Sequence, residues 1–101
     1  MFSNMRKVSK KQAAKNREIA KLKKALSPFC FICGRPASDY AHVLPKSIFP
    51  EYYTHPLNGF PACRECHNDF DSDRRFRQQQ KALFERALQI DERGAHRYFD
   101  I

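Results

Sequence analysis

The clearest hydrophobic pattern lies in the last third of the chain, where apolar residues recur at helical spacing. The stripe consists of Phe76, Leu83, Phe84, Ala87, Leu88 and Ile90. Intervals of three and four residues place such positions on one face of a helix, so the pattern predicts a helix over 74–93 that Gly94 ends. A face of this kind is more often buried in a core than open as a binding groove. The tail Arg97-Tyr98-Phe99 adds no pattern of its own.

A narrower apolar stripe runs through the first part of the chain, within a strongly basic segment. Its members are Val8, Ile19, Leu22 and Leu26. Ser9 and Gln12 have the spacing of a capping box, and Ser27-Pro28 disfavours a continued helix. We therefore predict a helix over 10–26, and the alternative is a solvated tail.

Shorter patterns between these segments indicate strands. Residues 39–44 alternate polar and apolar positions and predict a strand that ends at Pro45. Asn58-Gly59 is a turn signal, and the brief run 60–62 that follows predicts a second strand. Pro61 cannot donate a ladder hydrogen bond, so this strand should lie at a sheet edge.

A further helix is predicted to begin at Arg64 and to carry Cys66, His67 and Phe70. The polar run Asp71-Ser72-Asp73 should either break this helix or cap the next one. Two short strands with helices before and after them define a small α+β domain.

Composition favours a basic single domain. A chain of 101 residues with a formal net charge of +8 implies an acidic partner, most plausibly DNA. We divide it into a basic helical arm, 1–27, and a domain over 28–101. No run is long or apolar enough to span a membrane, and no secretory signal precedes the domain, so we expect a cytoplasmic protein. The expected nucleic-acid contacts are Lys10, Lys11, Lys15, Arg17, Lys46, Arg74 and Arg75.

Four cysteines form two Cys-x-x-Cys pairs, Cys30/Cys33 and Cys63/Cys66. Four thiolates grouped in this way hold one structural zinc ion tetrahedrally, which also supplies stability to so short a chain. The alternative, two disulfides, needs an oxidising compartment that nothing else in the sequence indicates. The interval between the pairs is longer than in simple zinc ribbons, and His42 and Asn58 lie within it.

These residues together carry a resemblance. Cys30-x-x-Cys33, Ala41-His42-Val43-Leu44-Pro45, Asn58 and Cys63-x-x-Cys66-His67 resemble the HNH endonuclease family, small phage-type or bacterial members included, over roughly residues 29–71. The resemblance implies a zinc-stapled ββα-metal core flanked by N- and C-terminal helices. It also implies metal-dependent hydrolysis of DNA phosphodiesters, leaving a 5′-phosphate and a 3′-hydroxyl.

The resemblance implies a role for each matching position. His42 matches the general base, Asn58 the residue that holds the loop of the base, and His67 a catalytic-metal ligand. Asp71, one helical turn after His67, would point the same way and is the expected second ligand. The ion would be Mg²⁺, Mn²⁺, Ni²⁺ or Zn²⁺, because histidine with carboxylate accepts each of these to some degree.

The sequence departs from the family immediately before His42. The family usually carries an acid or histidine there as a metal ligand, and this chain has Ala41. Asp39, two positions earlier on the same side of a strand, is the first candidate substitute, and His55 is the second.

Other functions therefore stay open. The departure at Ala41 and the charge also suit a non-catalytic zinc-knuckle nucleic-acid-binding protein, and the two flanking helices suit an accessory subunit. Asn58 could be a plain turn residue, and Asp71 a helix cap. A nuclease with one site would need two copies to cut both strands, so a homodimer is possible.

Overall fold

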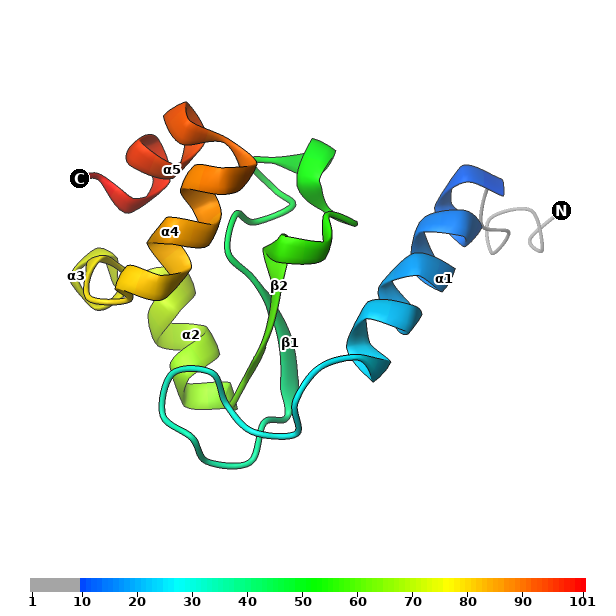
Figure 1. The fold of residues 1–101 in the computed structure, drawn as a ribbon, viewed down its shortest axis with the longest axis horizontal. Helices are drawn as coiled ribbons and strands as arrows, with labels where there is room; N and C mark the ends of the chain where they lie inside the picture. The colour runs from blue at the N-terminus through cyan, green and yellow to red at the C-terminus, as the bar shows by residue number, and fades with distance from the viewer. Residues whose placement is uncertain (1–9) are drawn as a thin grey trace, which may run out of the picture.

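The computed structural model describes residues 10–101, and within them the chain forms a small α+β domain (Figure 1). Its elements in order are α1 (Lys10–Lys24), β1 (Asp39–His42), the 3₁₀ helices η2 (Pro50–Tyr52) and η3 (Pro56–Asn58), β2 (Gly59–Ala62), α2 (Arg64–Ser72), α3 (Arg74–Gln78), α4 (Lys81–Ile90) and α5 (Glu92–Phe99). The predicted fold class is confirmed at this level.

The two strands form one antiparallel sheet, with Asp39 opposite Ala62 and His42 opposite Gly59. Both are edge strands, so Pro61 has the edge position expected for it. The first strand is shorter than the predicted 39–44: it ends at His42, although the amide of Val43 still donates to the carbonyl of Asn58 at 2.8 Å in the same register.

The C-terminal region differs from the prediction of one helix over 74–93. It forms three short helices, α3, α4 and α5. The break between α3 and α4 falls at Gln79 and Gln80, where no side chain caps α4, and the break between α4 and α5 falls at Asp91. Asp73 accepts the amide N–H of Phe76 at 3.1 Å and caps α3, while Asp91 accepts the amide of Gly94 at 3.0 Å and caps α5. An aspartate that caps a new helix competes with continuation of the previous one. Gly94 therefore lies inside α5 and ends nothing.

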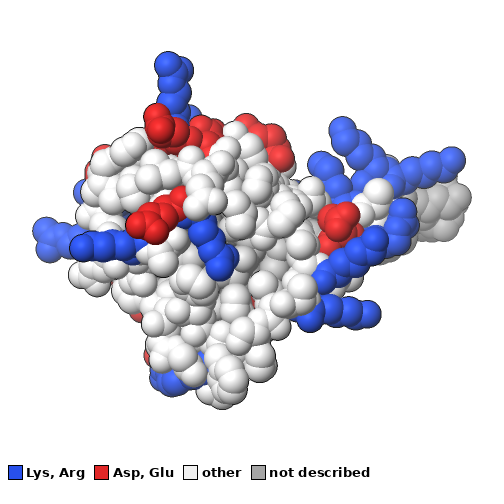
Figure 2. Space-filling model, viewed as in Figure 1, with Lys and Arg blue, Asp and Glu red and all other residues white. Residues whose placement is uncertain are grey.

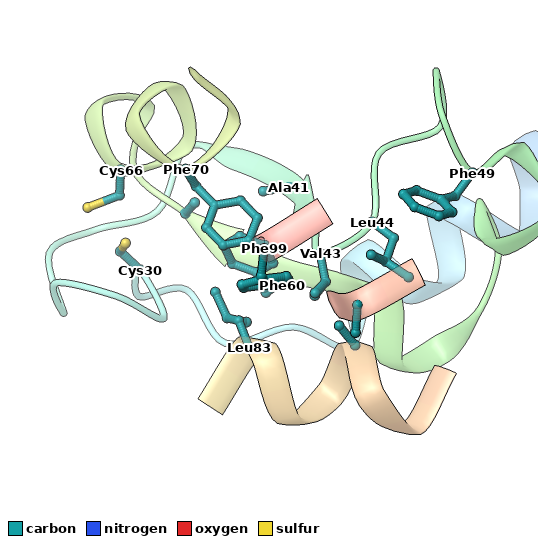
Figure 3. Close-up of a cluster of buried hydrophobic side chains, with 13 residues drawn as sticks. Cys30, Ala41, Val43, Leu44, Phe49, Phe60, Cys66, Phe70, Leu83 and Phe99 are labelled. Atoms are coloured by element: carbon teal, nitrogen blue, oxygen red, sulfur yellow. The ribbon is translucent and has the colours of Figure 1, made fainter. Parts of the chain in front are cut away.

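The core is built around aromatic rings from both ends of the domain (Figure 3). Phe70 of α2 packs edge-to-face on Phe60 of β2, with ring centroids 5.3 Å apart, and on Phe99 of α5, at 5.7 Å. Phe99 and Leu83 are completely buried. The C-terminal tail is thus part of the core, although the sequence pattern gave it no role.

Helix α1 stands to one side of the other elements (Figure 1). Its helical character is confirmed, and it ends at Lys24 rather than Leu26. The predicted contributions of Val8 and Ser9 lie outside the described residues. Lys and Arg side chains gather on α1 (Figure 2), as expected for a basic arm. Among residues 10–101, no helix has the length and apolarity that crossing a membrane requires.

Candidate functional site

The four cysteines converge on one point, Cys30 and Cys33 from the loop before β1, Cys63 and Cys66 from the start of α2. Their sulfur atoms all lie within 4.8 Å of one another, and those of Cys33 and Cys63 are 3.7 Å apart. Four sulfurs bound tetrahedrally to zinc at about 2.3 Å would be separated by roughly 3.8 Å. The predicted grouping is confirmed: these residues are positioned to hold one metal ion, and the spacing is consistent with a structural zinc.

In each Cys-x-x-Cys pair, a backbone amide points at the sulfur of the first cysteine. The amide of Cys33 points at the sulfur of Cys30 at 3.5 Å, and that of Cys66 at the sulfur of Cys63 at 3.4 Å. The first turn needs Gly34, whose φ of +80° is in the region that side chains disfavour. Both halves therefore present N–H groups that stabilise thiolate charge.

Arg35 adds a cation to the cysteine cluster. Its Nε donates to the sulfur of Cys33 at 3.4 Å, and its Nη2 contacts the sulfur of Cys63 at 3.9 Å and Glu65 at 3.3 Å. The guanidinium lowers the pKa of the Cys33 thiol to about 6, whereas burial raises the pKa of Cys66. Arg35 thus offsets part of the negative charge of a four-thiolate centre. No motif in the sequence predicts this role of Arg35.

Asn58 is a buried structural link between β2 and the loop after β1. Its Oδ1 accepts the amide of Leu44 at 2.8 Å, and its Nδ2 donates to the carbonyls of Leu44 and Tyr52, each at 3.0 Å. The side chain has 0% exposure. It holds the segment that follows His42, as the resemblance implies, and it is more than a turn residue.

Replacing Asn58 with alanine should therefore destabilise the domain by at least about 2 kcal/mol, because each buried backbone group left unpaired costs about 1–3 kcal/mol. Urea unfolding of the zinc-loaded protein measures this. The matched control is Asn68→Ala, an exposed asparagine on α2, which should stay within about 0.5 kcal/mol of wild type. Equal stability of the two variants would contradict the structural role of Asn58.

His42 ends β1 and lies between two tyrosine rings. Tyr40 packs edge-on at a centroid distance of 5.1 Å and Tyr53 at 5.4 Å. The backbone carbonyl of Tyr53 accepts a hydrogen bond from the ring, and Nε2 is buried without a hydrogen-bond partner. Since Nε2 has no partner, Nδ1 must be the donor, and Nε2 carries the lone pair. Burial lowers the pKa of His42, so the ring is neutral near pH 7.

His67 of α2 sits between two carboxylates on opposite sides of its ring. Its Nδ1 is 2.8 Å from Oδ2 of Asp39, and its Nε2 is 3.2 Å from Oδ2 of Asp71. The Nε2 and Asp71 atoms could share one ion, because ligand bonds of about 2.0–2.2 Å allow that separation. Asp39 is on the other nitrogen. It therefore fits the orienting partner of a ligating histidine, not the ligand predicted in place of the residue at Ala41.

Arg64 reinforces this role for Asp39. It binds the carboxylate with two nitrogens, Nε at 2.7 Å and Nη2 at 3.0 Å. Arg64 and then His67 hold the pKa of Asp39 far below its usual range, although the Asp39 side chain is only 10% exposed. Burial raises the pKa of Asp71. Within the described residues, the four cysteines are the one group of three or more metal-ligating side chains that meet at a point.

Ala41, which stands where the family carries a metal ligand, and His55, a candidate substitute for that ligand, both have structural roles. Ala41 is fully buried in the core opposite Phe60, so a charged side chain there would face the hydrophobic interior. His55 caps η3, its Nδ1 accepting the amide of Leu57 at 3.1 Å. The predicted substitution by His55 has no support from this geometry.

The predicted basic residues differ in their surroundings. Arg74 is exposed and pairs with Asp100 at 3.1 Å, and Lys46 lies 4.2 Å from the centre of the Tyr53 ring. Lys10, Lys11, Lys15, Arg17 and Arg75 add charge on α1 and α3, where most are exposed. Arg77, also on α3, is buried: its guanidinium carbon lies 4.0 Å from the centre of the Tyr98 ring, and it donates to the carbonyl of Phe70.

Comparisons were made with protein-family models, with curated proteins and with solved structures. None of them matches this chain.

Proposed function

We propose that the protein is a metal-dependent DNA endonuclease that hydrolyses phosphodiester bonds with His42 as general base. The observation that carries this proposal is the state of His42: Nδ1 bound to a backbone carbonyl, Nε2 with a free lone pair, and the following loop fixed by Asn58. A neutral, oriented imidazole of this kind suits removal of a proton from water. The resemblance to HNH endonucleases adds to it.

The residues of this chain would divide the work as follows. His42 Nε2 would accept a proton from the attacking water, whose oxygen bonds to phosphorus as the bond from phosphorus to the 3′ oxygen breaks. The leaving 3′ oxygen takes a proton from solvent, so the products are a 5′-phosphate and a 3′-hydroxyl. Because Nε2 is buried beside Tyr40 and Tyr53, this ring cover has to open when substrate binds. Positive charge at the site attracts the DNA backbone.

Two metal ions belong to the proposal. The four cysteines would hold a zinc ion that is purely structural, since sulfur fills every position. His67 Nε2 and Asp71 would hold the second, with the ring oriented by Asp39. A divalent cation bound there, Mg²⁺, Mn²⁺, Ni²⁺ or Zn²⁺, supplies charge stabilisation at the phosphoryl and leaving oxygens. Two copies of the chain would be needed to cut both strands.

Nicking of supercoiled plasmid tests the proposal. Pure zinc-loaded protein should convert supercoiled to open-circular DNA when Mg²⁺, Mn²⁺ or Ni²⁺ is added, and should not do so without an added ion. Asp71→Asn should lower this activity because it removes one proposed ligand, while Asp73→Asn, which affects the cap of α3, should not. Absence of nicking with every ion would reject the nuclease.

A second function is favoured by one specific observation. The Nε2 atom of His42 is enclosed, and Asp39 is fully engaged by Arg64, so a protein that only binds nucleic acid would need neither residue to be available. Tight, salt-sensitive DNA binding without nicking would identify this non-catalytic zinc-knuckle protein.

A further inference from the structure

An open groove runs between the end of α1 and the start of α2. It has a volume of about 460 Å³ and is lined by Lys23, Ser38, Asp39, Tyr40, Arg64, His67 and Asn68. A smaller hollow of about 230 Å³ adjoins it and shares four of these residues, extending along the linker after α1 towards Pro28 and Pro61. Because Lys23, Ser38, Asp39 and Tyr40 line both, the two hollows are contiguous.

Among the residues that line this groove, positive charges outnumber negative ones. Lys23 comes from the basic arm and Arg64 from α2, so cations from two separate helices line it. The one carboxylate among the lining residues, Asp39, is already bound by Arg64 and His67. No acidic side chain of residues 10–101 pairs with Lys23, whose Nζ lies 5.9 Å from the centre of the Tyr40 ring. The groove therefore presents positive charge that the protein does not neutralise.

The guanidinium of Arg64 has one edge free to donate hydrogen bonds to an anion. Its Nε and Nη2 hold Asp39, while its side chain is 72% exposed, and in the described part of the chain Nη1 makes no hydrogen bond. A guanidinium fixed on one edge by a carboxylate is pre-organised and loses little freedom when it binds a phosphate on the other. Lys23 and Lys46 also contribute positive potential at His42.

We propose that Lys23 and Arg64 form a clamp for one phosphodiester of a nucleic-acid strand that lies along this groove. The proposal deepens the proposed function, because it places the phosphate beside His67 and makes the arm a wall of the site. It differs from a general basic arm in a testable way: one lysine of α1 has a special role, and its neighbours do not.

A binding experiment separates these two descriptions. A short fluorescein-labelled DNA strand is titrated with zinc-loaded protein, with no other divalent ion added, and fluorescence anisotropy is followed at several salt concentrations. Lys23→Ala should weaken binding roughly tenfold, as expected for loss of a charged hydrogen bond, and should lower the salt slope by about one. Lys24→Ala, an equal charge change one residue along the same helix, should weaken binding less than about twofold.

A double-mutant cycle tests whether the two cations share a phosphate. The effects of Lys23→Ala and Arg64→Ala should be strongly non-additive, whereas Lys24→Ala and Arg64→Ala should add. Unchanged zinc stoichiometry and far-ultraviolet circular dichroism confirm that each variant is folded. Additive effects of Lys23→Ala and Arg64→Ala, or equal losses for the two lysine variants, would overturn the clamp.

The same variants keep this inference separate from the proposed function. If Lys23→Ala selectively weakens DNA binding but wild type never nicks plasmid, the clamp stands and the nuclease is rejected. If wild type nicks plasmid but Lys23→Ala and Lys24→Ala behave alike in binding, the nuclease stands and the clamp is rejected.

Discussion

Replacing His42 with asparagine is expected to reduce metal-dependent nicking by about 10²–10⁴-fold, the usual contribution of a general base. The substitution is chosen for its shape. The side-chain amide of asparagine can keep a donor near the position of Nδ1 and so retain the hydrogen bond to the Tyr53 carbonyl. It removes Nε2, the atom with the lone pair. Loss of activity then reports on the base rather than on the fold.

The control is His96→Asn, which makes the same chemical change at an exposed position on α5. It should leave the nicking rate within about twofold of wild type. Zinc stoichiometry and thermal unfolding should match among all three proteins. Nicking by His42→Asn at the wild-type rate would exclude His42 as the base, even if metal dependence persisted.

The pH dependence of nicking provides a second readout of His42. Burial lowers the pKa of this histidine below its ordinary value of 6.5, with the charges of His67, Lys23 and Lys46 acting in the same direction. A general base works only when it is deprotonated. The ratio kcat/KM, which reports the free enzyme, should therefore rise with pH, with the midpoint of its acidic limb below about 6.5. A midpoint above 6.5 would contradict the assignment.

Removal of the metal from the cysteine cluster is expected to unfold the domain. Binding of structural zinc supplies about 10–16 kcal/mol in zinc-finger peptides, which is as large as the total stability of a typical domain, about 5–15 kcal/mol. Cys30 and Cys66 also belong to the buried core (Figure 3), so losing the ion disturbs the packing of Phe60 and Phe70. Loss of the metal should therefore also disrupt the packing of the core.

Two measurements check this expectation. A chelator should abolish the helical circular dichroism of the purified protein, and one equivalent of Zn²⁺ should restore it. Cys63→Ser should be unfolded at every zinc concentration that restores wild type, because it lacks one of four ligands. The control is Ser38→Ala, an exposed hydroxyl near the same strand, which should fold normally. A folded, monomeric Cys63→Ser variant would exclude a structural metal.

The C-terminal region shows why its fold could not be predicted from sequence alone. The apolar spacing of Leu83, Phe84 and Ala87 correctly indicated a helix, because spacing reflects which face is buried. The bounds were wrong, because an aspartate can end a helix or lie harmlessly on its surface. Only the position of the next segment decides that Asp91 acts as the cap of α5. Burial of Phe99 likewise depends on where α5 packs.

Asp39 gives the same lesson for the candidate site. Its position two residues before Ala41 indicated correctly that it would lie near His67, since alternate residues of a strand share a face. Whether it reaches Nδ1 or Nε2 of that ring depends on the packing of α2 against β1. The contact is with Nδ1, so Nε2, the nitrogen that we propose as a metal ligand, faces Asp71 instead.

The sequence by itself determined the features that depend on local spacing: the four-cysteine centre, two strands, a basic helix and a helix carrying His67. Tertiary structure alone decided which charges face each other. Arg77 turns inward to Tyr98, Arg35 reaches the sulfur of Cys63 and the carboxylate of Glu65, and Lys23 and Arg64 line the same groove. The physical reason is that these partners are distant in sequence, so their pairing is fixed only when the packing of the helices places them together.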